Sequence, residues 1–459
     1  MVKIKNKKAL VENTRSKNDK QARAFALDAL EASLNAADPV EVVKSLVKIR
    51  GNSLQIGKCK FSLSQFKHIY VVGGGKASGK MAEALESILE DHISNGAINV
   101  PYNSGPYKTC RIEIKEASHP LPDNAGMKGA KRILDLAHQA GESDLVICLI
   151  SGGGSSLMPV PRGNITLIEK QQVTGALLKS GATINEINTV RKHISDFKGG
   201  WLAKNAYPAT IINLILSDVI GDPLDFIASG PTVPDSTTFT DSVEILKRYH
   251  LWENLPNSVK IVLIDGQKGV IPETPKKGEN VFRKVHNIVA GNNRLATSAS
   301  CNRLKKAGLP SLLLTSSLEG EARHIGTMLA SIANELRISG NPLPTPCGII
   351  AGGETTVTVI GKGKGGRNQE IALSAALGMA GRDGVVIASL STDGIDGPTD
   401  ASGAIVDGNT INRSQNLEVD AESSLANNDS YNFFLSLNDL IFTGLTGTNV
   451  NDVSIIVAI

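Results

Sequence analysis

The side chains most able to do chemistry in this sequence lie in loops rich in glycine, serine and aspartate. In "VVGGGKASGKMA", the glycines of residues 73–75 follow an apolar run and precede Lys76. A strand, a glycine-rich turn and a helix amino terminus together direct backbone N–H groups at one spot, which favours an anion. The stretch is not a P-loop, because Met81 stands where the magnesium-binding hydroxyl belongs, nor a Rossmann fingerprint, because Ser78 replaces the third glycine. The alternative is a tight turn carrying a solvent-exposed lysine.

A second loop, "LISGGGSSL", repeats this chemistry with hydroxyl groups. Ser151 ends an apolar run, the glycines of residues 152–154 follow, and Ser155 and Ser156 come next. Glycine lets the backbone approach an anion closely, and the serines add donors. The nucleophile elbow G-x-S-x-G does not fit this spacing, and a simple helix cap at Ser155 is the alternative. Among the histidines only His119, in "SHPLPD", lies in a comparable loop, where a structural role is the alternative.

Two further loops are acidic. In "LSDVIGDPLD", Asp218 directly follows an apolar run and Asp222 comes soon after. Carboxylates at the end of a strand suit magnesium binding or general-base work, although aspartate is also a common turn residue. The loop "STDGIDGPTDASG" contains Asp393, Asp396 and Asp400, but their spacing does not match an EF-hand. A polar turn is the alternative for this second loop.

One loop is basic. In "VIGKGKGGRNQE", Lys362, Lys364 and Arg367 lie in a glycine-rich loop, and Asn368 is placed to cap the helix that follows. Basic side chains beside a helix amino terminus make a strong anion site. Just before this loop, "AGGETT" places Glu354 after two glycines. The sequence therefore predicts an anion site here as well.

Buried strands are expected to position these loops. Apolar runs at Ile69–Val72, Leu145–Ile150 and Ile211–Leu216 are each followed by a cluster of Gly, Ser or Asp. Continuous apolar runs of this length are typical of parallel strands buried on both faces. Ligands of such sheets gather at the carboxyl ends of the strands, which is where the clusters lie.

The pattern predicts an α/β fold with two domains, each layered helix–sheet–helix. A polar stretch at residues 265–279 is expected to be a linker between a domain of residues 1–264 and a domain of residues 280–459. In the second domain, "NIVAGN", "SLLLTS", "GIIAGGETTVTVIG", "GVVIASLSTDG" and "SIIVAI" predict strands, and "RLATSASCNRLKKAG" predicts a helix.

Composition excludes several classes of protein. Of the 459 residues, 41% are hydrophobic and 20% are charged, and the net charge of +3 is spread along the chain, so neither a nucleic-acid nor a membrane partner is indicated. The five cysteines are widely spaced and predict neither a zinc site nor a disulfide framework. The first residues never develop the apolar core of a signal peptide, so we expect a cytoplasmic protein.

Taken together, these loops resemble the glycerate 2-kinase family, whose carboxy-terminal part is called the MOFRL domain. The similar segments include "VVGGGKASGKMA", "SHPLPD", "LISGGGSSL", "LSDVIGD", "GGETTVTV", "GKGGRNQE", "STDGIDGPTDASG" and "TGTNVND", in the family's order. The resemblance implies two three-layer α/β domains facing a central cleft, the first doubly wound and Rossmann-like. It implies a kinase that uses ATP and Mg²⁺ to phosphorylate the C2 hydroxyl of D-glycerate, giving 2-phosphoglycerate for lower glycolysis.

The resemblance also implies roles for particular residues. Lys76 and Arg367 match the family's catalytic lysine and arginine, and Asp218 matches the aspartate of the S-D-V motif. Asp218 and Asp222 share the roles of base and metal ligand, and which residue has which role stays open because "GDP" stands where many members have G-D-D-P. A separate departure from the family is Leu445, which replaces a proline near the end. The residues expected to bind substrate or phosphate are Gly73, Gly74, Gly75, Ser151, Gly152, Gly153, Gly154, Ser155, Ser156, Glu354 and Asn368.

Two other functions remain open at this point. A hydroxypyruvate reductase would use NAD(P)H, but no acidic ribose ligand follows the first glycine loop at Rossmann spacing. A non-catalytic protein that binds sugar acids or nucleotides would not need Lys76, Asp218 and Arg367 together. The expected partners are small molecules, glycerate and ATP, and the sequence leaves room for a homodimer.

Overall fold

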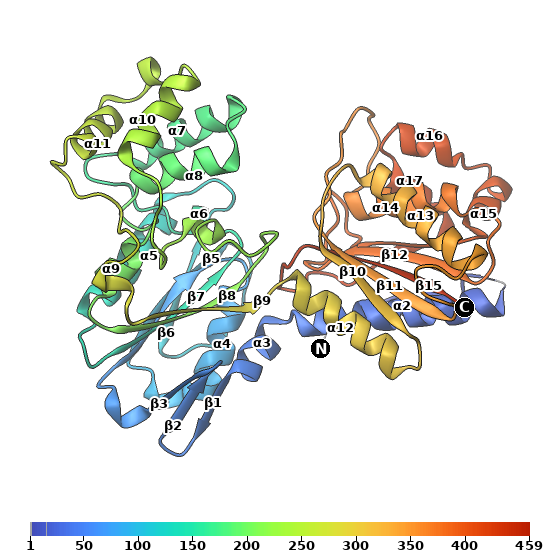
Figure 1. Cartoon of the computed structure of the whole chain (residues 1–459), viewed down its shortest axis with the longest axis horizontal. Coiled ribbons are helices and arrows are strands. Elements are labelled where there is room, and N and C mark those ends of the chain that lie inside the picture. Colours follow the sequence, from blue (N-terminus) through green and yellow to red (C-terminus); the bar gives the residue numbers. More distant parts are fainter. Residues whose placement is uncertain (1, 15) are drawn as a thin grey trace. The chain divides into compact units, whose positions relative to one another are not determined.

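The computed structural model describes residues 2–14 and 16–459, and the chain divides into two compact units (Figure 1). One unit is Val42–Ala290. The other combines the chain up to Glu41 with Gly291–Ile459. Both units are built of helices and strands in alternation, so the predicted α/β class is confirmed. Within the described residues, no helix is both long enough and apolar enough to cross a membrane.

The larger sheet of the unit Val42–Ala290 has the strand order β6-β5-β4-β7-β8-β9. Its strands are β4 (Ile69–Gly74), β5 (Asn95–Pro101), β6 (Ile112–Ala117), β7 (Leu145–Ser151), β8 (Thr210–Leu216) and β9 (Val285–Gly291). The pairs from β6 to β8 are all parallel. The chain moves outward from β4 to β6 and then returns to β7 on the other side of β4. This reversal is a topological switch point, and the first two glycine-rich loops follow the two strands that form it.

Helices cover both faces of this sheet. α4 (Ser78–Leu89) connects β4 to β5, and α5 (Asn124–Gln139) connects β6 to β7. These two crossovers run in opposite directions along the sheet, so right-handed connections place α4 and α5 on opposite faces. α9 (Trp201–Ala206) packs beside α5. Every residue of β7 is buried, as the apolar run predicts, and the doubly wound architecture is confirmed.

The remaining elements of this unit lie outside the parallel sheet. A helical group of α7 (Leu167–Lys179), α8 (Ile184–His193), α10 (Phe239–Arg248) and α11 (Asn257–Gln267) has its own apolar core, and Figure 1 shows these helices together. α6 (Gly154–Leu157) is a single turn after β7. A small antiparallel sheet contains β1 (Val47–Arg50), β2 (Ser53–Ile56) and β3 (Cys59–Ser62), and α3 (Pro39–Leu46) precedes it. Short 3₁₀ turns are η1 (Leu63–Gln65), η2 (Glu90–His92), η3 (Ile227–Ser229), η4 (Trp252–Asn254) and η5 (Asn280–Phe282).

The sheet of the other unit is mixed, with the strand order β10-β11-β15-β12-β13-β14. Its strands are β10 (Ser311–Leu318), β11 (Cys347–Gly353), β12 (Val385–Ser391), β13 (Gly403–Asp407), β14 (Leu440–Ile441) and β15 (Asp452–Ala458). Only β10 and β11 are parallel. The last strand of the chain is inserted between β11 and β12, antiparallel to both, so Asp452 at its start lies beside Gly353 and Ser391 at the ends of its neighbours.

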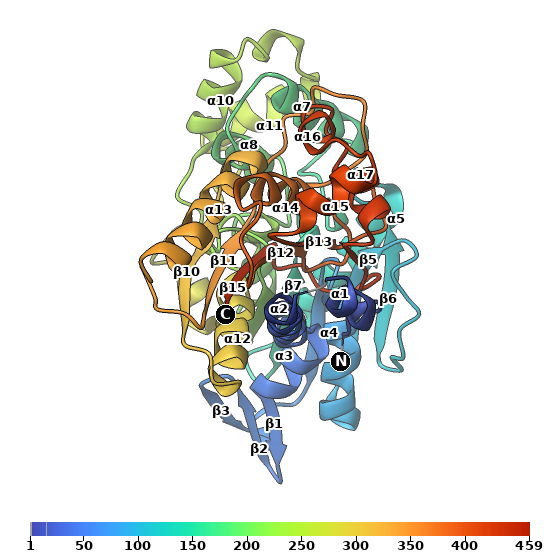
Figure 2. The same ribbon diagram turned by 90° about the vertical axis from the view of Figure 1, so that its right-hand side faces the viewer.

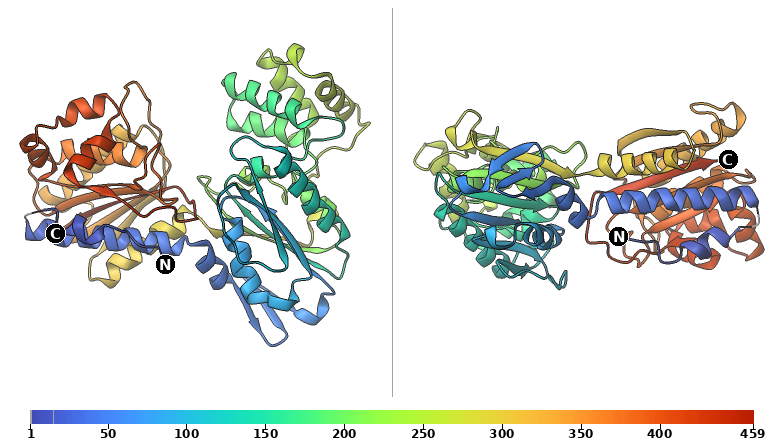
Figure 3. Two further views of the ribbon diagram at one scale, coloured as in Figure 1. Left: turned by 180° about the vertical axis from the view of Figure 1, so that it is seen from behind. Right: turned by 90° about the horizontal axis from the view of Figure 1, so that it is seen from below.

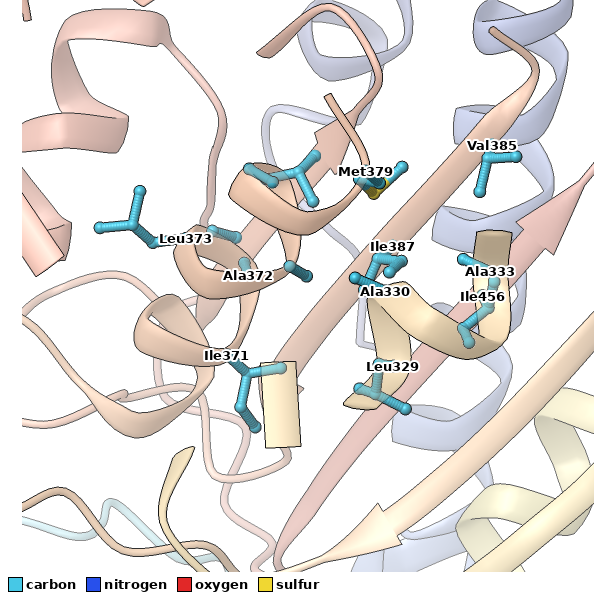
Figure 4. Packing of buried hydrophobic residues seen from close by; sticks show 14 of the residues in the cluster. Leu329, Ala330, Ala333, Ile371, Ala372, Leu373, Met379, Val385, Ile387 and Ile456 are labelled. Carbon is cyan, nitrogen blue, oxygen red and sulfur yellow. The ribbon is translucent and has the colours of Figure 1, made fainter. Parts of the chain in front are cut away.

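Two layers of helices enclose this mixed sheet. α13 (Ala322–Ile338), α14 (Arg367–Gly378) and α17 (Ser430–Leu437) cover one face, together with α15 (Thr410–Asn416) and α16 (Ala421–Ala426) (Figure 2). α2 (Lys17–Ala36) and α12 (Asn293–Lys306) lie side by side on the other face (Figure 3), and the short α1 (Lys7–Glu12) precedes α2. In the core, apolar side chains of α13 and α14 pack on β12 and β15 (Figure 4); they include Leu329, Ala330, Ala333, Ile371, Ala372, Val385, Ile387 and Ile456.

The observed division of the chain differs from the predicted division at residues 1–264 and 280–459. Helix α2 packs on β12 and β15, in the unit that contains the mixed sheet, because its apolar face needs a sheet to cover. Arg23 on that helix is buried against Asp407 and Asp439. The predicted strand in "NIVAGN" is β9, which extends the first sheet instead of opening the second. The second segment of the discontinuous unit, which contains the mixed sheet, therefore begins at Gly291.

The stretch at residues 265–279 is not a free linker. Its first residues end α11, and the buried Thr274 donates a hydrogen bond to Asp235 over 3.0 Å. The strand predicted across "GIIAGGETTVTVIG" ends at Gly353. The residues after it form a loop, apart from a single bridge between Thr356 and Glu321.

Candidate active site

The two glycine-rich loops at the switch point are packed directly against each other. Gly73 and Gly75 adopt φ angles of 140° and 151°. A Cβ on Gly73 would lie 2.1 Å from the carbonyl oxygen of Leu149, and one on Gly75 would lie 2.1 Å from the hydroxyl of Ser151. Only glycine fits such close contacts. Gly74 is also crowded, with its Cβ position 3.0 Å from the carbonyl oxygen of Asn99.

The first loop uses its own backbone donors inside the protein. Gly75 N–H donates to Asn99 O (3.0 Å), and Lys76 N–H donates to Gly152 O (2.8 Å). Ala77 N–H donates to the hydroxyl of Ser151 (3.0 Å). The structure thus places the glycines of this loop in backbone packing, and they do not direct free N–H groups at an anion as the sequence suggested.

The side chain of Lys76 is what the first loop offers to a ligand. It is partly exposed, and among the described residues it forms no ion pair with a carboxylate. Its Cγ lies 3.4 Å from the position that a Cβ on Gly153 would occupy. Lys76 therefore lies over the second glycine loop, and no described carboxylate forms an ion pair with it.

Three polar side chains from different parts of the unit surround Gly152 and Gly153. A Cβ on Gly152 would lie 1.9 Å from Oδ2 of Asp218, and one on Gly153 would lie 2.9 Å from Cδ2 of His119. Lys76 contacts the same glycine. Burial, and then the charge of Lys76, lower the pKa of His119, so its imidazole is neutral at pH 7.

The second loop supplies free backbone donors. Within the described residues, the N–H groups of Gly152, Gly153, Gly154 and Ser155 have no protein acceptor. The last two belong to the first turn of α6, where helical N–H groups have no intrahelical partner. Gly153, at a φ of 82°, directs the chain into that turn. Of the two glycine loops, this one therefore presents, with Lys76 beside it, the free N–H groups that an anion site requires.

The three serines of the second loop have different tasks. The hydroxyl of Ser151 joins the loops through Ala77 N–H and lies 3.1 Å from the hydroxyl of Ser78. Ser156 donates to the carbonyl oxygen of Gly153 over 3.0 Å, which closes the turn. Ser151 and Ser156 therefore hold the loop in shape, and of the three serines only Ser155 presents its hydroxyl to other charged groups.

Sequence reasoning missed the basic residues that contact Ser155. The Nη2 atom of Arg191 donates to the Ser155 hydroxyl over 2.6 Å, and Nζ of Lys198 donates to the Ser155 carbonyl oxygen over 2.6 Å. The hydroxyl of Ser229 lies 2.9 Å from that of Ser155. The available signal was the basic segment "RKHISDFKGG", which ends a helix and runs into a glycine pair.

Arg367 lies in the other unit, at the start of α14, and is held by two carboxylates. Its Nε and Nη2 atoms donate to both oxygens of Asp452 (2.5 and 3.0 Å), and Nη1 donates to Glu354 (2.6 Å). Burial raises the pKa of Asp452 to about 7, although Arg367 opposes the shift. The guanidinium is thus fixed in one orientation, and Glu354 is a partner of Arg367 in this arrangement.

The predicted cap Asn368 lies inside the helix instead. Gly366 occupies the cap position of α14, and the two carboxylate oxygens of Asp396 accept from the N–H groups of Asn368 (3.0 Å) and Gln369 (2.9 Å). Asp396 caps from a distant loop because the local sequence offers only glycine at the cap itself. The Asn368 side chain bridges Asp396 and the hydroxyl of Ser389.

A pocket of about 720 Å³ lies beside Arg367 within this unit. This volume falls in the range of small-molecule sites. Its walls include Glu354, Gly363, Gly365, Gly366, Arg367, Glu370, Ser391, Asp393, Asp396 and Asn428. Lys362 and Lys364 are absent from that wall, and Lys364 instead places its ammonium 4.2 Å from the ring centre of Tyr431. Of the three basic residues that the sequence predicted in this loop, only Arg367 lines the pocket.

Metal-binding groups are sparse. In the part of the chain that the structure describes, no group of three or more His, Cys, Asp or Glu side chains could hold a metal ion. Mg²⁺ in phosphoryl-transfer sites is commonly held by one or two carboxylates and by the substrate's phosphates. Asp218 beside Gly152 fits that smaller requirement, with Asp222 in the same loop.

Comparison with known proteins places these features in context. Two family models match the chain, a domain of unknown function (DUF4147) over residues 25–264 and the MOFRL family over residues 347–452. A glycerate 2-kinase of Pyrococcus horikoshii is 42% identical, covering 95% of this chain and 97% of the relative. A protein of Agrobacterium vitis named a putative hydroxypyruvate reductase is 42% identical, covering 95% and 94%. The crystal structure of a glycerate kinase from Thermotoga maritima is 40% identical, with a TM-score of 0.86, covering 95% of this chain and 99% of that one.

Proposed function

The chain belongs to the glycerate 2-kinase family, and on that premise we propose that it transfers the γ-phosphoryl group of ATP to the C2 hydroxyl of D-glycerate. The products are ADP and 2-phosphoglycerate. The observation that carries the proposal is the surface formed by Lys76 and the free N–H groups of Gly152–Ser155, which suits a phosphoryl group. Phosphoryl transfer depends mainly on positioning and on neutralising charge, and this surface supplies both.

The side chains that surround the second loop divide the work of the transfer. The carboxylate of Asp218, beside Gly152, accepts the proton of the C2 hydroxyl while that oxygen forms its bond to the γ-phosphorus. The bond from the γ-phosphorus to the bridging oxygen of ADP breaks in the same step. Lys76 neutralises charge on the transferred oxygens. His119, neutral beside Lys76, can donate or accept a hydrogen bond without adding charge.

Mg²⁺ would be held by Asp218 and Asp222 together with the phosphate oxygens, and it would supply further neutralisation of phosphate charge. Asp222 adopts a φ of 55°, an uncommon conformation that aspartate tolerates better than most residues. The position of Asp218 against the glycine loop supports its assignment as the base.

Arg367 is proposed as a catalytic residue that binds phosphoryl oxygens. Its planar guanidinium has three donors occupied by Asp452 and Glu354, and two N–H groups remain for phosphoryl oxygens. The carboxylates fix its orientation before ligand binds, which lowers the entropy cost of using it. Glu354 and Asn368 then act by positioning Arg367 and the start of α14, not by contacting substrate.

A hydroxypyruvate reductase is less well supported by the geometry. Dinucleotide binding at a switch point needs free N–H groups in the first glycine loop for the pyrophosphate. Here Gly75, Lys76 and Ala77 donate their N–H groups to Asn99, Gly152 and Ser151 of the protein itself. The N–H groups of residues 75–77 are therefore already used within the protein and do not face a pyrophosphate.

The test of the proposed function is identification of the product. The enzyme is incubated with ATP, Mg²⁺ and D-glycerate, and the phosphorylated carbon is assigned by ³¹P and ¹H NMR. We expect 2-phosphoglycerate, and no ATP consumption when glycerate is omitted. Formation of 3-phosphoglycerate would contradict the C2 assignment. Oxidation of NADH with hydroxypyruvate, in the absence of ATP turnover, would show that the protein is a reductase and not a kinase.

A further inference from the structure

A second group of basic side chains contacts the GGGSS loop at Ser155, two residues after the glycine that Lys76 approaches. Arg191 comes from the last turn of α8, and Lys198 follows in the loop before α9. Both converge on one residue, because Arg191 donates to the Ser155 hydroxyl and Lys198 donates to the Ser155 carbonyl oxygen, each over 2.6 Å. The elements that meet here are remote in sequence, so the arrangement is a product of the fold.

These two cations are buried without an acid to balance them. Lys198 is 0% exposed and Arg191 is partly buried. Within the described residues, neither one has a carboxylate at ion-pair distance. The neighbouring Lys192 shows the contrast, because it pairs with Asp235 at 3.3 Å. Burial, and then Arg191, lower the pKa of Lys198 well below its ordinary value.

An uncompensated pair of buried cations is costly to the folded protein. Such a cost is commonly retained where a ligand of opposite charge binds. The backbone beside it is also unusual, since Ala228 and Ser229 both adopt positive φ angles, 51° and 61°. Strained conformations of non-glycine residues gather at functional sites. Here the strain places the Ser229 hydroxyl between Ser155 (2.9 Å) and the amide oxygen of Asn188 (3.2 Å).

The two sides of the loop match the two polar ends of a small hydroxy acid. On the Gly152–Gly153 side lie Asp218 and Lys76, and on the Ser155 side lie Arg191 and Ser229. Two residues of chain span at most roughly 7 Å, so one three-carbon molecule can reach from one side to the other. Arginine binds a carboxylate with two parallel hydrogen bonds, which gives selectivity as well as affinity.

We propose that Arg191, with Ser155 and Ser229, forms the recognition site for the carboxylate of the hydroxy-acid substrate, and that Lys198 holds Ser155 in place through its hydrogen bond to the Ser155 carbonyl oxygen. This inference rests on the proposed function. It assigns the phosphoryl group to the Lys76 side of the loop and the carboxylate to the Arg191 side. The enzyme therefore selects 2-hydroxy carboxylates over uncharged polyols of the same size.

The test is the steady-state kinetics of Arg191→Gln, which keeps polarity and much of the volume but removes the charge. We expect the KM for D-glycerate to rise by roughly two orders of magnitude, as when a buried charge loses its partner, while the KM for ATP stays within about twofold. Arg191→Lys should recover part of the loss, because it restores the charge without the fork. Arg248→Gln is the matched control, since Arg248 forms an exposed ion pair with Glu186 on the same helical group.

The chemical form of the ligand gives a second readout. Wild-type enzyme should phosphorylate D-glyceramide far less efficiently than D-glycerate, and Arg191→Gln should lose most of that discrimination. Binding of D-glycerate without ATP, followed by calorimetry, should weaken in the same variant. Arg191→Gln should not lower the melting temperature, because it removes a partly buried charge that no acid balances.

Each result separates this inference from the proposed function. An active wild-type kinase whose Arg191→Gln variant keeps its KM for D-glycerate would overturn the carboxylate site alone. A parallel rise in the KM values for ATP and D-glycerate would indicate that Arg191 binds the phosphates, and it would also overturn the carboxylate site. A wild-type enzyme that does not phosphorylate glycerate would remove the proposed function, and calorimetry with D-glycerate would still test the carboxylate site.

Discussion

Lys76 and Arg367 are both cations in glycine-rich loops, but their surroundings separate their roles. Lys76 has no carboxylate partner among the described residues, so its charge is available to a phosphoryl group. Arg367 donates to both oxygens of Asp452 and to Glu354, so its charge is already compensated. We therefore assign charge neutralisation chiefly to Lys76 and orientation chiefly to Arg367.

Replacing Lys76 by alanine should remove most turnover and leave the fold intact. The backbone N–H of Lys76, which holds Gly152, is retained in the variant. By analogy with other cations that act in the phosphoryl-transfer step, kcat should fall by roughly 10³-fold or more. Steady-state kinetics and a melting curve measure the two effects separately. Lys80→Ala, four residues along in α4, is the comparison, and a larger loss there than at Lys76 would contradict the assignment.

Lys170 in α7 gives a prediction about pH. It is 4% exposed, and burial, with Arg191 as the next cause, lowers its pKa to about 7. Between pH 7 and pH 10.5 the unfolded chain then binds more protons at this residue than the folded chain, so the free energy of unfolding rises with pH. Below pH 7 the lysine is charged in both states, and the whole penalty of burying that charge is present. The shift corresponds to an upper bound of about 5 kcal/mol.

Lys170→Met should therefore stabilise the protein, and more so at pH 7 than at pH 9.5. The carbonyl oxygens of Val160 and Ile194, which accept from Lys170, keep other donors in Ser195 and Arg162. Urea unfolding at the two pH values measures the difference. Lys179→Met, at the exposed end of the same helix, should change little at either pH. An equal gain for Lys170→Met at both pH values would show that its charge is not the cause.

At the scale of elements, the contact between the loops after β4 and β7 sets the geometry of the candidate site. Gly75→Ala would place a methyl group 2.1 Å from the hydroxyl and 2.6 Å from the carbonyl oxygen of Ser151, at a φ of 151°. We expect a loss of roughly 2–6 kcal/mol in the free energy of unfolding, combining overpacking with backbone strain. Gly175→Ala in α7 meets nothing within 4 Å and should instead stabilise by about 1 kcal/mol. Chemical denaturation of both variants decides this, and a mild effect at Gly75 would mean that the loops can separate.

The sequence predicted the elements best where burial is complete. The apolar runs at β4, β7 and β8 identify strands without ambiguity, and the glycine loops at their ends follow from the switch point. It failed where a distant residue decides the outcome. Asp396 caps α14 from another loop, so the local pattern wrongly favoured Asn368. Arg191 reaches Ser155 only through the packing of α8, which no spacing in the sequence reveals.

At the scale of the whole molecule, one unit is discontinuous in sequence. The amphipathic pattern of α2 predicts a helix with one buried face, but it does not say which sheet that face covers. The answer depends on Arg23, which is 0% exposed and donates to Asp407 (2.7 Å) and Asp439 (2.7 Å). Both acids lie more than 380 positions further along the chain. A division of the chain at its longest polar stretch could not find this pairing.

The discontinuous unit predicts a localised effect of Arg23→Met. Removing the arginine leaves two buried carboxylates without their shared partner, which costs roughly 3–5 kcal/mol, although Arg413 still pairs with Asp439. Hydrogen exchange measured by mass spectrometry should rise in peptides of Gly291–Ile459, while the unit Val42–Ala290 stays protected. Lys20→Met on the same helix loses only a partly exposed pair with Glu12 and should change exchange little. If exchange rose instead within Val42–Ala290, α2 would belong with that unit, as the predicted boundary at residue 264 required.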